Sequence, residues 1–111
     1  MKFKFYDEDF ELKFIIDKYV RDNSTYIEAV VMENGNPIEP FGYVTTCIPF
    51  STMEEDEVVL DTNNSGELIK EMKKQKLIKL TDRTVSSGFC VYPIGKLTKK
   101  FYTESLREVN I

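Results

Sequence analysis

The chain has 111 residues, a net charge of −4 and no histidine. Its length suits one domain with one core, spanning residues 1–111, and its 41% hydrophobic and 13% aromatic content predicts a packed globule rather than a disordered chain. Without histidine, the Ser-His-Asp and Cys-His catalytic schemes are excluded, and we expect no enzyme.

The composition also predicts a cytoplasmic protein that does not enter a membrane. No apolar run approaches the roughly 20 residues that cross a bilayer. The N-terminus turns acidic at residues 7–9, where a signal peptide would need apolar residues. In a reducing compartment Cys47 and Cys90, both in strand-like runs, are expected to be buried, unreactive thiols. Two distant cysteines cannot form a common structural zinc site, so no metal or cofactor is expected.

Alternating patterns predict antiparallel strands in the first half of the chain. Phe3 and Phe5 are expected to point inward from a strand over residues 2–6. A second strand has a buried face made of every second residue: Phe10, Leu12, Phe14 and Ile16.

Turn signals divide the strands that follow. A turn at residues 22–24 precedes a strand over residues 25–33, and Asn34-Gly35 is a specific hairpin signal. Pro37 and Pro40 lack N–H donors, so they predict an edge or loop before an extended run over residues 41–48. The acidic loop 51–56 is expected to be solvated rather than to bind a metal ion, because three consecutive carboxylates cannot all converge on one ion.

The stretch 57–94 is predicted to organise the fold around a helix. A short strand over residues 57–60 precedes Asn64 and Glu67, which resemble a capping box and predict a helix from about Ser65 to Gln75. An apolar stripe on that helix is expected to face the core: Leu68, Ile69 and Met72.

Beyond the helix the pattern becomes extended again. A strand over residues 77–80, a turn over 81–83 and a long strand over 84–92 are predicted. Gly88 indicates a bulge in the last strand, and the alternative is that the small residues 86–88 admit a ligand.

The C-terminal segment 98–111 carries a helical pattern. Its apolar residues are spaced four and then three apart: Tyr102, Leu106 and Val109. They predict a short amphipathic helix, or a tail that orders against a partner. The whole pattern predicts an α+β fold, with a curled antiparallel sheet of about six strands, one central helix packed on a face and a possible short C-terminal helix.

Charge is unevenly distributed along the chain. Residues 1–60 carry five Lys/Arg and thirteen Asp/Glu, which gives −8, and residues 61–111 carry ten and six, which gives +4. The asymmetry is consistent with two solvated faces of one domain or with a charged partner. The candidate binding residues lie on the helix and just beyond it: Lys70, Lys73, Lys74, Lys76, Lys79 and Arg83.

Two stretches resemble a small bacterial and phage domain family of unknown function. The first runs from Gly35-x-Pro37 to Thr46-Cys47-Ile48-Pro49, with Cys47 where the family tends to asparagine and an apparent insertion over residues 39–42. The second combines Asn64-x-Gly66, Leu77-Ile78 and the run from Arg83 to Phe89. The resemblance implies an origin in phage, plasmids or other mobile elements, but it does not indicate which activity the protein has.

Three classes of function are compatible with these features. The favoured class is a non-enzymatic accessory protein of a phage or mobile element that binds a host protein, for example as an inhibitor of a host defence factor. The alternative is a nucleic-acid-binding module that uses the basic half and stacking rings at Tyr92, Phe101 and Tyr102. An enzyme is the third class, but nothing pairs carboxylate, Tyr, Lys or Cys side chains at a recognisable spacing.

Overall fold

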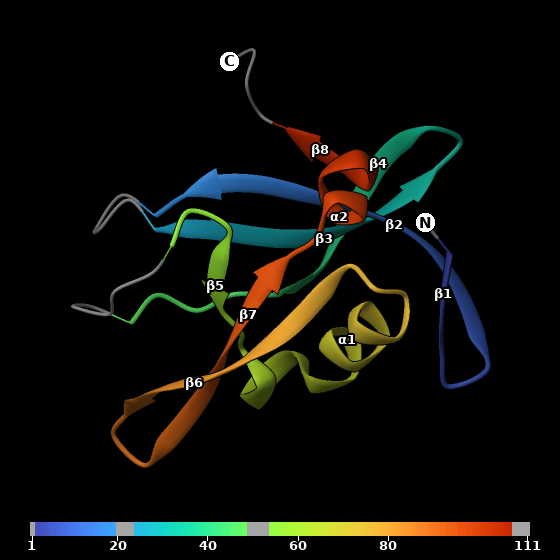
Figure 1. The fold of residues 1–111 in the computed structure, drawn as a ribbon. Coiled ribbons are helices and arrows are strands. Elements are labelled where there is room, and N and C mark those ends of the chain that lie inside the picture. Colours follow the sequence, from blue (N-terminus) through green and yellow to red (C-terminus); the bar gives the residue numbers. More distant parts are fainter. Residues whose placement is uncertain (1, 20–23, 49–53, 108–111) are drawn as a thin grey trace.

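The computed structural model describes residues 2–19, 24–48 and 54–107, which form two β-sheets and two helices (Figure 1). The first sheet contains β1 (Lys2–Phe5), β2 (Glu8–Lys18), β3 (Thr25–Glu33), β4 (Asn36–Tyr43) and β8 (Ser105–Arg107). The second sheet contains β5 (Glu57–Val59), β6 (Ile78–Ser87) and β7 (Cys90–Leu97), in the order β5-β7-β6. The helices are α1 (Thr62–Lys74) and α2 (Lys99–Glu104).

The predicted α+β fold, with a single sheet organised by a central helix, is wrong. The domain is dominated by its strands, and the later strands form a separate sheet. One physical reason lies in β4, which is an edge strand: Pro37 and Pro40 offer no N–H donors, and its register with β3 shifts twice. After β4 the two sheets are linked by an isolated bridge between Thr45 and Leu60.

Several local predictions for the first sheet are confirmed. Phe3, Phe5, Leu12 and Phe14 are buried, and β3 covers residues 25–33 as expected. The hairpin between β3 and β4 turns at Asn34 and Gly35, which both have positive φ angles (52° and 81°), as a two-residue turn of this type requires. The turn expected at residues 22–24 lies largely outside the described residues.

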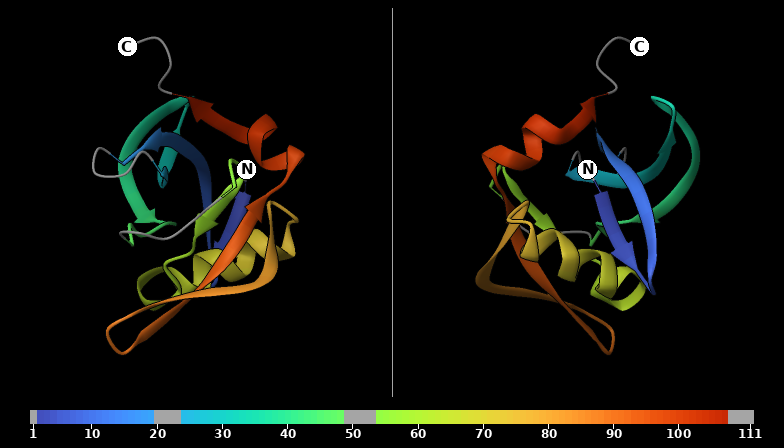
Figure 2. Two further views of the ribbon diagram at one scale, coloured as in Figure 1. Left: turned by 60° about the vertical axis from the view of Figure 1, so that its left-hand side comes forward. Right: turned by 90° about the vertical axis from the view of Figure 1, so that its right-hand side faces the viewer.

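Helix α1 packs its apolar stripe into the core between β1 and the second sheet (Figure 2). Leu68, Ile69 and Met72 are buried, as predicted. The helix begins earlier than expected, because its capping residue is Asp61 and not Asn64. The side chain of Asp61 accepts the backbone N–H of Asn64 at 3.2 Å. A non-helical Ser65 kinks the first turn.

The strand predicted over residues 84–92 is wrong, because the chain reverses within it. Gly88, with φ +62°, lies in the turn of the β6–β7 hairpin rather than at a bulge in one strand. The register between β6 and β7 shifts instead between Leu80 and Thr84. The residues predicted to form a turn there, 81–83, belong to the continuous strand β6. Alternation alone could not locate the reversal, because both arms of a hairpin alternate.

The predicted C-terminal helix is only partly present. Helix α2 ends at Glu104, and Leu106 lies in β8, which pairs in parallel with Phe14–Ile16 of β2. Backbone hydrogen bonding to β2 therefore determines the conformation of residues 105–107, although the spacing of their apolar residues is helical. Val109 lies outside the described residues. Within the described ranges no helix is long and apolar enough to cross a membrane.

Candidate functional site

Three of the candidate lysines share the outer side of α1. Lys70, Lys73 and Lys74 are exposed, on the side of the helix away from its buried stripe. The ammonium of Lys74, which is exposed, lies 3.6 Å from the carboxylate of Glu71, which is half-buried. The helical spacing thus brings these three ammonium groups to one surface, as the sequence predicted.

The basic surface extends beyond the end of α1 through residues that the sequence analysis missed. The Lys100 ammonium donates to the Gln75 carbonyl at 2.9 Å, and the Thr98 hydroxyl donates to the Lys76 carbonyl at 2.7 Å. Lys76 itself has a φ of 63° and leads the chain away from the helix. These contacts bring α2 against the carboxyl end of α1, where the helix dipole favours cations.

We call this region the α1 basic surface. It consists of six exposed lysines from α1, the residues after it and α2: Lys70, Lys73, Lys74, Lys76, Lys99 and Lys100. The hydroxyl of Thr98 donates hydrogen bonds to the carbonyls of Lys76 and Leu77, more than 20 positions earlier, and these bonds bring the start of α2 to the end of α1. The only local signal was the lysine pair 99–100 itself.

The other two predicted binding residues, Lys79 and Arg83, lie on β6. Arg83 forms an ion pair with Glu57, a buried carboxylate on β5. Its hydrogen bond to Arg83 lowers the pKa of Glu57, and the same bond raises the pKa of Arg83. Lys79 lies on β6 directly opposite Lys96 of β7. Arg83 therefore links β6 to β5 through its side chain, which remains 49% exposed.

The rings predicted to stack on nucleic-acid bases are poorly placed for that role. Phe101 is completely buried, with its ring 5.4 Å from that of Phe14. Tyr102 is half-buried. Tyr92 is half-buried too, and a hydrogen bond with Cys90 raises its pKa.

The cysteines are thiols, but they are less buried than predicted. Cys47 and Cys90 are both half-buried, and neither forms a disulfide in the described chain. The amide of Asn63 donates to the Cys90 sulfur at 3.4 Å. Cys90 faces α1 from the hairpin next to the exposed residues 86–88, which line neither of the two hollows described below.

The acidic loop is partly used for internal pairing. Asp56 lies 3.6 Å from Lys96, and the backbone N–H of Glu54 donates to Glu57 at 2.9 Å. Tyr102 and the three residues 54–56 line a shallow hollow of about 490 Å³. Within residues 2–19, 24–48 and 54–107, no group of three or more His, Cys, Asp or Glu side chains is arranged to hold a metal ion.

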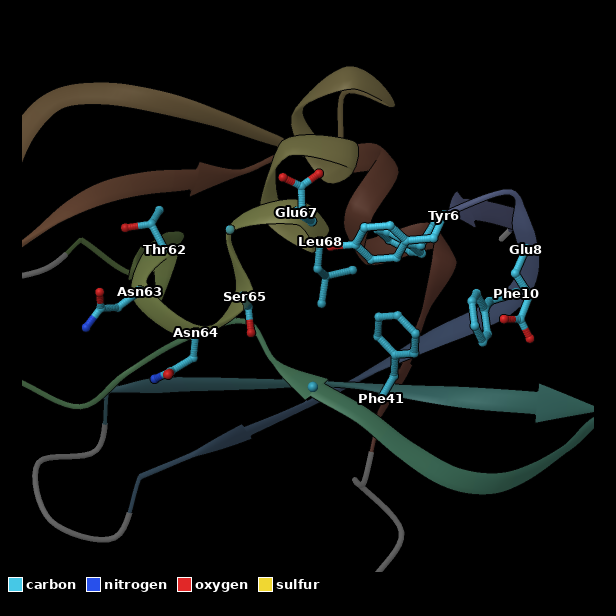
Figure 3. Close-up of a pocket in the computed structure, with 13 residues that line it drawn as sticks. Tyr6, Glu8, Phe10, Phe41, Thr62, Asn63, Asn64, Ser65, Glu67 and Leu68 are labelled. Carbon is cyan, nitrogen blue, oxygen red and sulfur yellow. The ribbon is translucent and has the colours of Figure 1, made fainter.

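A groove at the opposite end of α1 was not predicted. It has a volume of about 620 Å³ and lies between the start of α1, the β1–β2 turn and β4 (Figure 3). Phe5, Phe10 and Phe41 form its aromatic floor, with ring centroids 5.1–6.1 Å apart. The alternating aromatic residues of β1 and β2 were a sequence signal for a core, but not for a groove.

In the described part of the chain, the fold and these surfaces define a small two-sheet β domain whose longer helix, α1, has a basic surface at its carboxyl end and an aromatic groove at its amino end. The chain belongs to the family described as "Domain of unknown function (DUF4313)", whose model matches residues 13–110. No curated protein and no solved structure matches the chain.

Proposed function

We propose that this protein acts by binding an acidic protein surface through the α1 basic surface, and that it performs no catalysis. The observation that carries the proposal is the gathering of six exposed lysines from α1, the residues after it and α2. Charge complementarity of this kind accelerates association and selects partners. We further propose a host protein as the partner and an accessory role in a phage or mobile element, such as inhibition of a defence factor.

A protein partner is favoured over nucleic acid by the aromatic residues. Binding of single strands usually combines a basic groove with rings that are free to stack on bases. The ring of Phe101 is buried in the core, and Tyr102 is half-buried beside it, with ring centroids 5.8 Å apart. The basic surface therefore offers charge without an accessible stacking platform.

The test is capture of partners from an extract of the natural host, with and without nuclease. Reversal of Lys70, Lys73 and Lys74 to glutamate should abolish capture of a protein that survives nuclease treatment. The corresponding glutamine variant should weaken capture less, because it removes the attraction without introducing repulsion. A single surface change usually alters stability by no more than about 0.5 kcal/mol, and reversed charges near the negative end of the helix dipole add to this, so a thermal melt must show that each variant is folded.

A control variant whose net charge changes by −4, against −6 in the triple reversal, separates the surface from most of the effect of overall charge. Lys4→Glu combined with Lys18→Glu adds negative charge on β1 and β2, outside the α1 basic surface. This control should retain capture. Loss of capture in the control, or its survival in the triple reversal, would contradict the proposal. Capture that disappears with nuclease and falls steeply with salt would instead favour nucleic acid.

A further inference from the structure

The groove beside the amino end of α1 has an apolar floor and one carboxylate at each of two opposite edges (Figure 3). Leu68 is buried next to the three phenyl rings, and Tyr6 is 91% exposed at the mouth of the groove (Figure 3). Glu8 and Glu67 are the only charged residues in its lining. One carboxylate comes from the start of β2 and the other from α1, so the acidic character does not depend on one loop.

The amino end of a helix would normally favour an anion, but here that preference is already satisfied. The carboxylate of Asp61, which is buried, accepts the backbone N–H of Asn64 at 3.2 Å and its side-chain amide at 3.1 Å. It thus places a negative charge at the positive end of the helix dipole. The remaining polar lining consists of neutral side chains and two further carboxylates, so the groove as a whole favours a cation.

The volume of the groove and its aromatic lining favour a guanidinium over an inorganic cation or an ammonium. A volume of about 620 Å³ is in the range of ligand pockets and exceeds what an inorganic ion needs. A guanidinium group stacks on aromatic faces, is weakly hydrated and forms paired hydrogen bonds with carboxylates. A lysine ammonium is more strongly hydrated and cannot match the planar fork.

We propose that this groove binds an arginine side chain presented by a segment of a partner protein, with the guanidinium on the aromatic residues and paired with Glu8 or Glu67. The main chain of the segment would lie near Ser65 and Asn64, whose polar groups line the other side. The proposal uses none of the lysines of the α1 basic surface, so either surface can be correct without the other.

The probes are capped tripeptides titrated into the ¹⁵N-labelled protein. Acetyl-Ala-Arg-Ala-amide should shift the amide signals of Gly42 and Gly66, which line the groove. The peptides with Lys, Ala or Glu at the central position should bind progressively less well. Equal shifts from the Arg and Ala peptides, or no shifts at Gly42 and Gly66, would overturn the proposal.

Variants test whether the carboxylates of Glu8 and Glu67 cause the preference for the arginine peptide. Glu8→Gln and Glu67→Gln together should weaken binding of the arginine peptide by about fivefold, as expected for loss of a partly exposed charge pair. Glu33→Gln removes an exposed carboxylate at the end of β3, outside the lining, and should leave binding unchanged. Unaltered thermal melts would show that the variants are folded, and unaltered affinity in the Glu8/Glu67 variant would contradict the proposal.

Discussion

Arg83 of β6 donates a hydrogen bond to Glu57 of β5, and the pair spans the central strand β7 of the second sheet. Glu57 is buried, and the backbone N–H of Glu54 donates to the same carboxylate oxygen at 2.9 Å. A buried carboxylate with two donors is stabilised in its ionised form. The pair therefore links the two outer strands of a sheet that has only three.

The first prediction concerns the acid stability of this pair. The pKa of Glu57 is lower in the folded chain than its ordinary value near 4.3, so the folded state favours ionised Glu57. Its contribution to stability is present above about pH 4.3 and is lost as the pH falls through the lower pKa of the folded state. Glu57→Gln should lower the urea midpoint at neutral pH and flatten its dependence on pH in this acid range. Arg83→Gln should also reduce the slope, and curves parallel to that of the wild type would contradict the role of the pair.

The second prediction distinguishes the two candidate caps of α1. Asp61→Ala should destabilise the protein by about 1–2 kcal/mol, because its carboxylate accepts the N–H of Asn64. Asn64→Ala should cost less, because its backbone N–H can still bond to Asp61. Urea denaturation of both variants measures the difference. A larger cost for Asn64→Ala would restore Asn64 as the cap that the sequence predicted.

The third prediction compares two glycines. A Cβ atom on Gly95 of β7 would lie 2.7 Å from Cδ1 and 3.2 Å from Cγ of Leu60, which is completely buried. Gly95→Ala should therefore destabilise the protein by about 1–3 kcal/mol. Gly66→Ala in α1 meets no atom within 4 Å and should stabilise it by about 0.5–1 kcal/mol. Thermal melts of the two variants should shift in opposite directions. An unchanged or higher melting temperature for Gly95→Ala would show that the packing around Leu60 is not limiting, and a lower one for Gly66→Ala would contradict the prediction for that position.

The fourth prediction concerns alkaline pH. Burial, together with a 2.7 Å hydrogen bond to Glu28, raises the pKa of Tyr26. The folded chain thus holds this phenolic proton more tightly than the unfolded chain does. Its contribution to stability is complete below about pH 10 and is lost as the pH rises above that value. Tyr26→Phe should reduce this alkaline decline, and the part that remains is the contribution of Tyr92, whose pKa is also raised.

Tyr6→Phe provides the matched control for Tyr26, because Tyr6 is 91% exposed. The control should leave the alkaline decline in stability unchanged. An ultraviolet titration should show that one late-ionising phenol is lost in the Tyr26 variant and retained in the Tyr6 variant. Disappearance of that phenol in the Tyr6 variant would contradict the assignment.

Part of the candidate site followed from the sequence alone. Lys70, Lys73 and Lys74 lie on the exposed side of α1 because helical spacing opposes them to Leu68 and Met72. Arg83 could not be assigned in this way, because its partner Glu57 is 26 residues away. The buried ring of Phe101 shows the same limit, since it packs on Phe14 from the far end of the chain.

The sequence by itself determined the features that depend on neighbouring residues. The Asn34-Gly35 turn, the alternating face of β2 and the apolar stripe of α1 each arise from interactions within a few positions. Only the tertiary structure decided the division into two sheets, the parallel pairing of β8 with β2, the α1 basic surface and the aromatic groove. These features join segments far apart in the chain, and their free energy depends on backbone pairing and burial that no local pattern specifies.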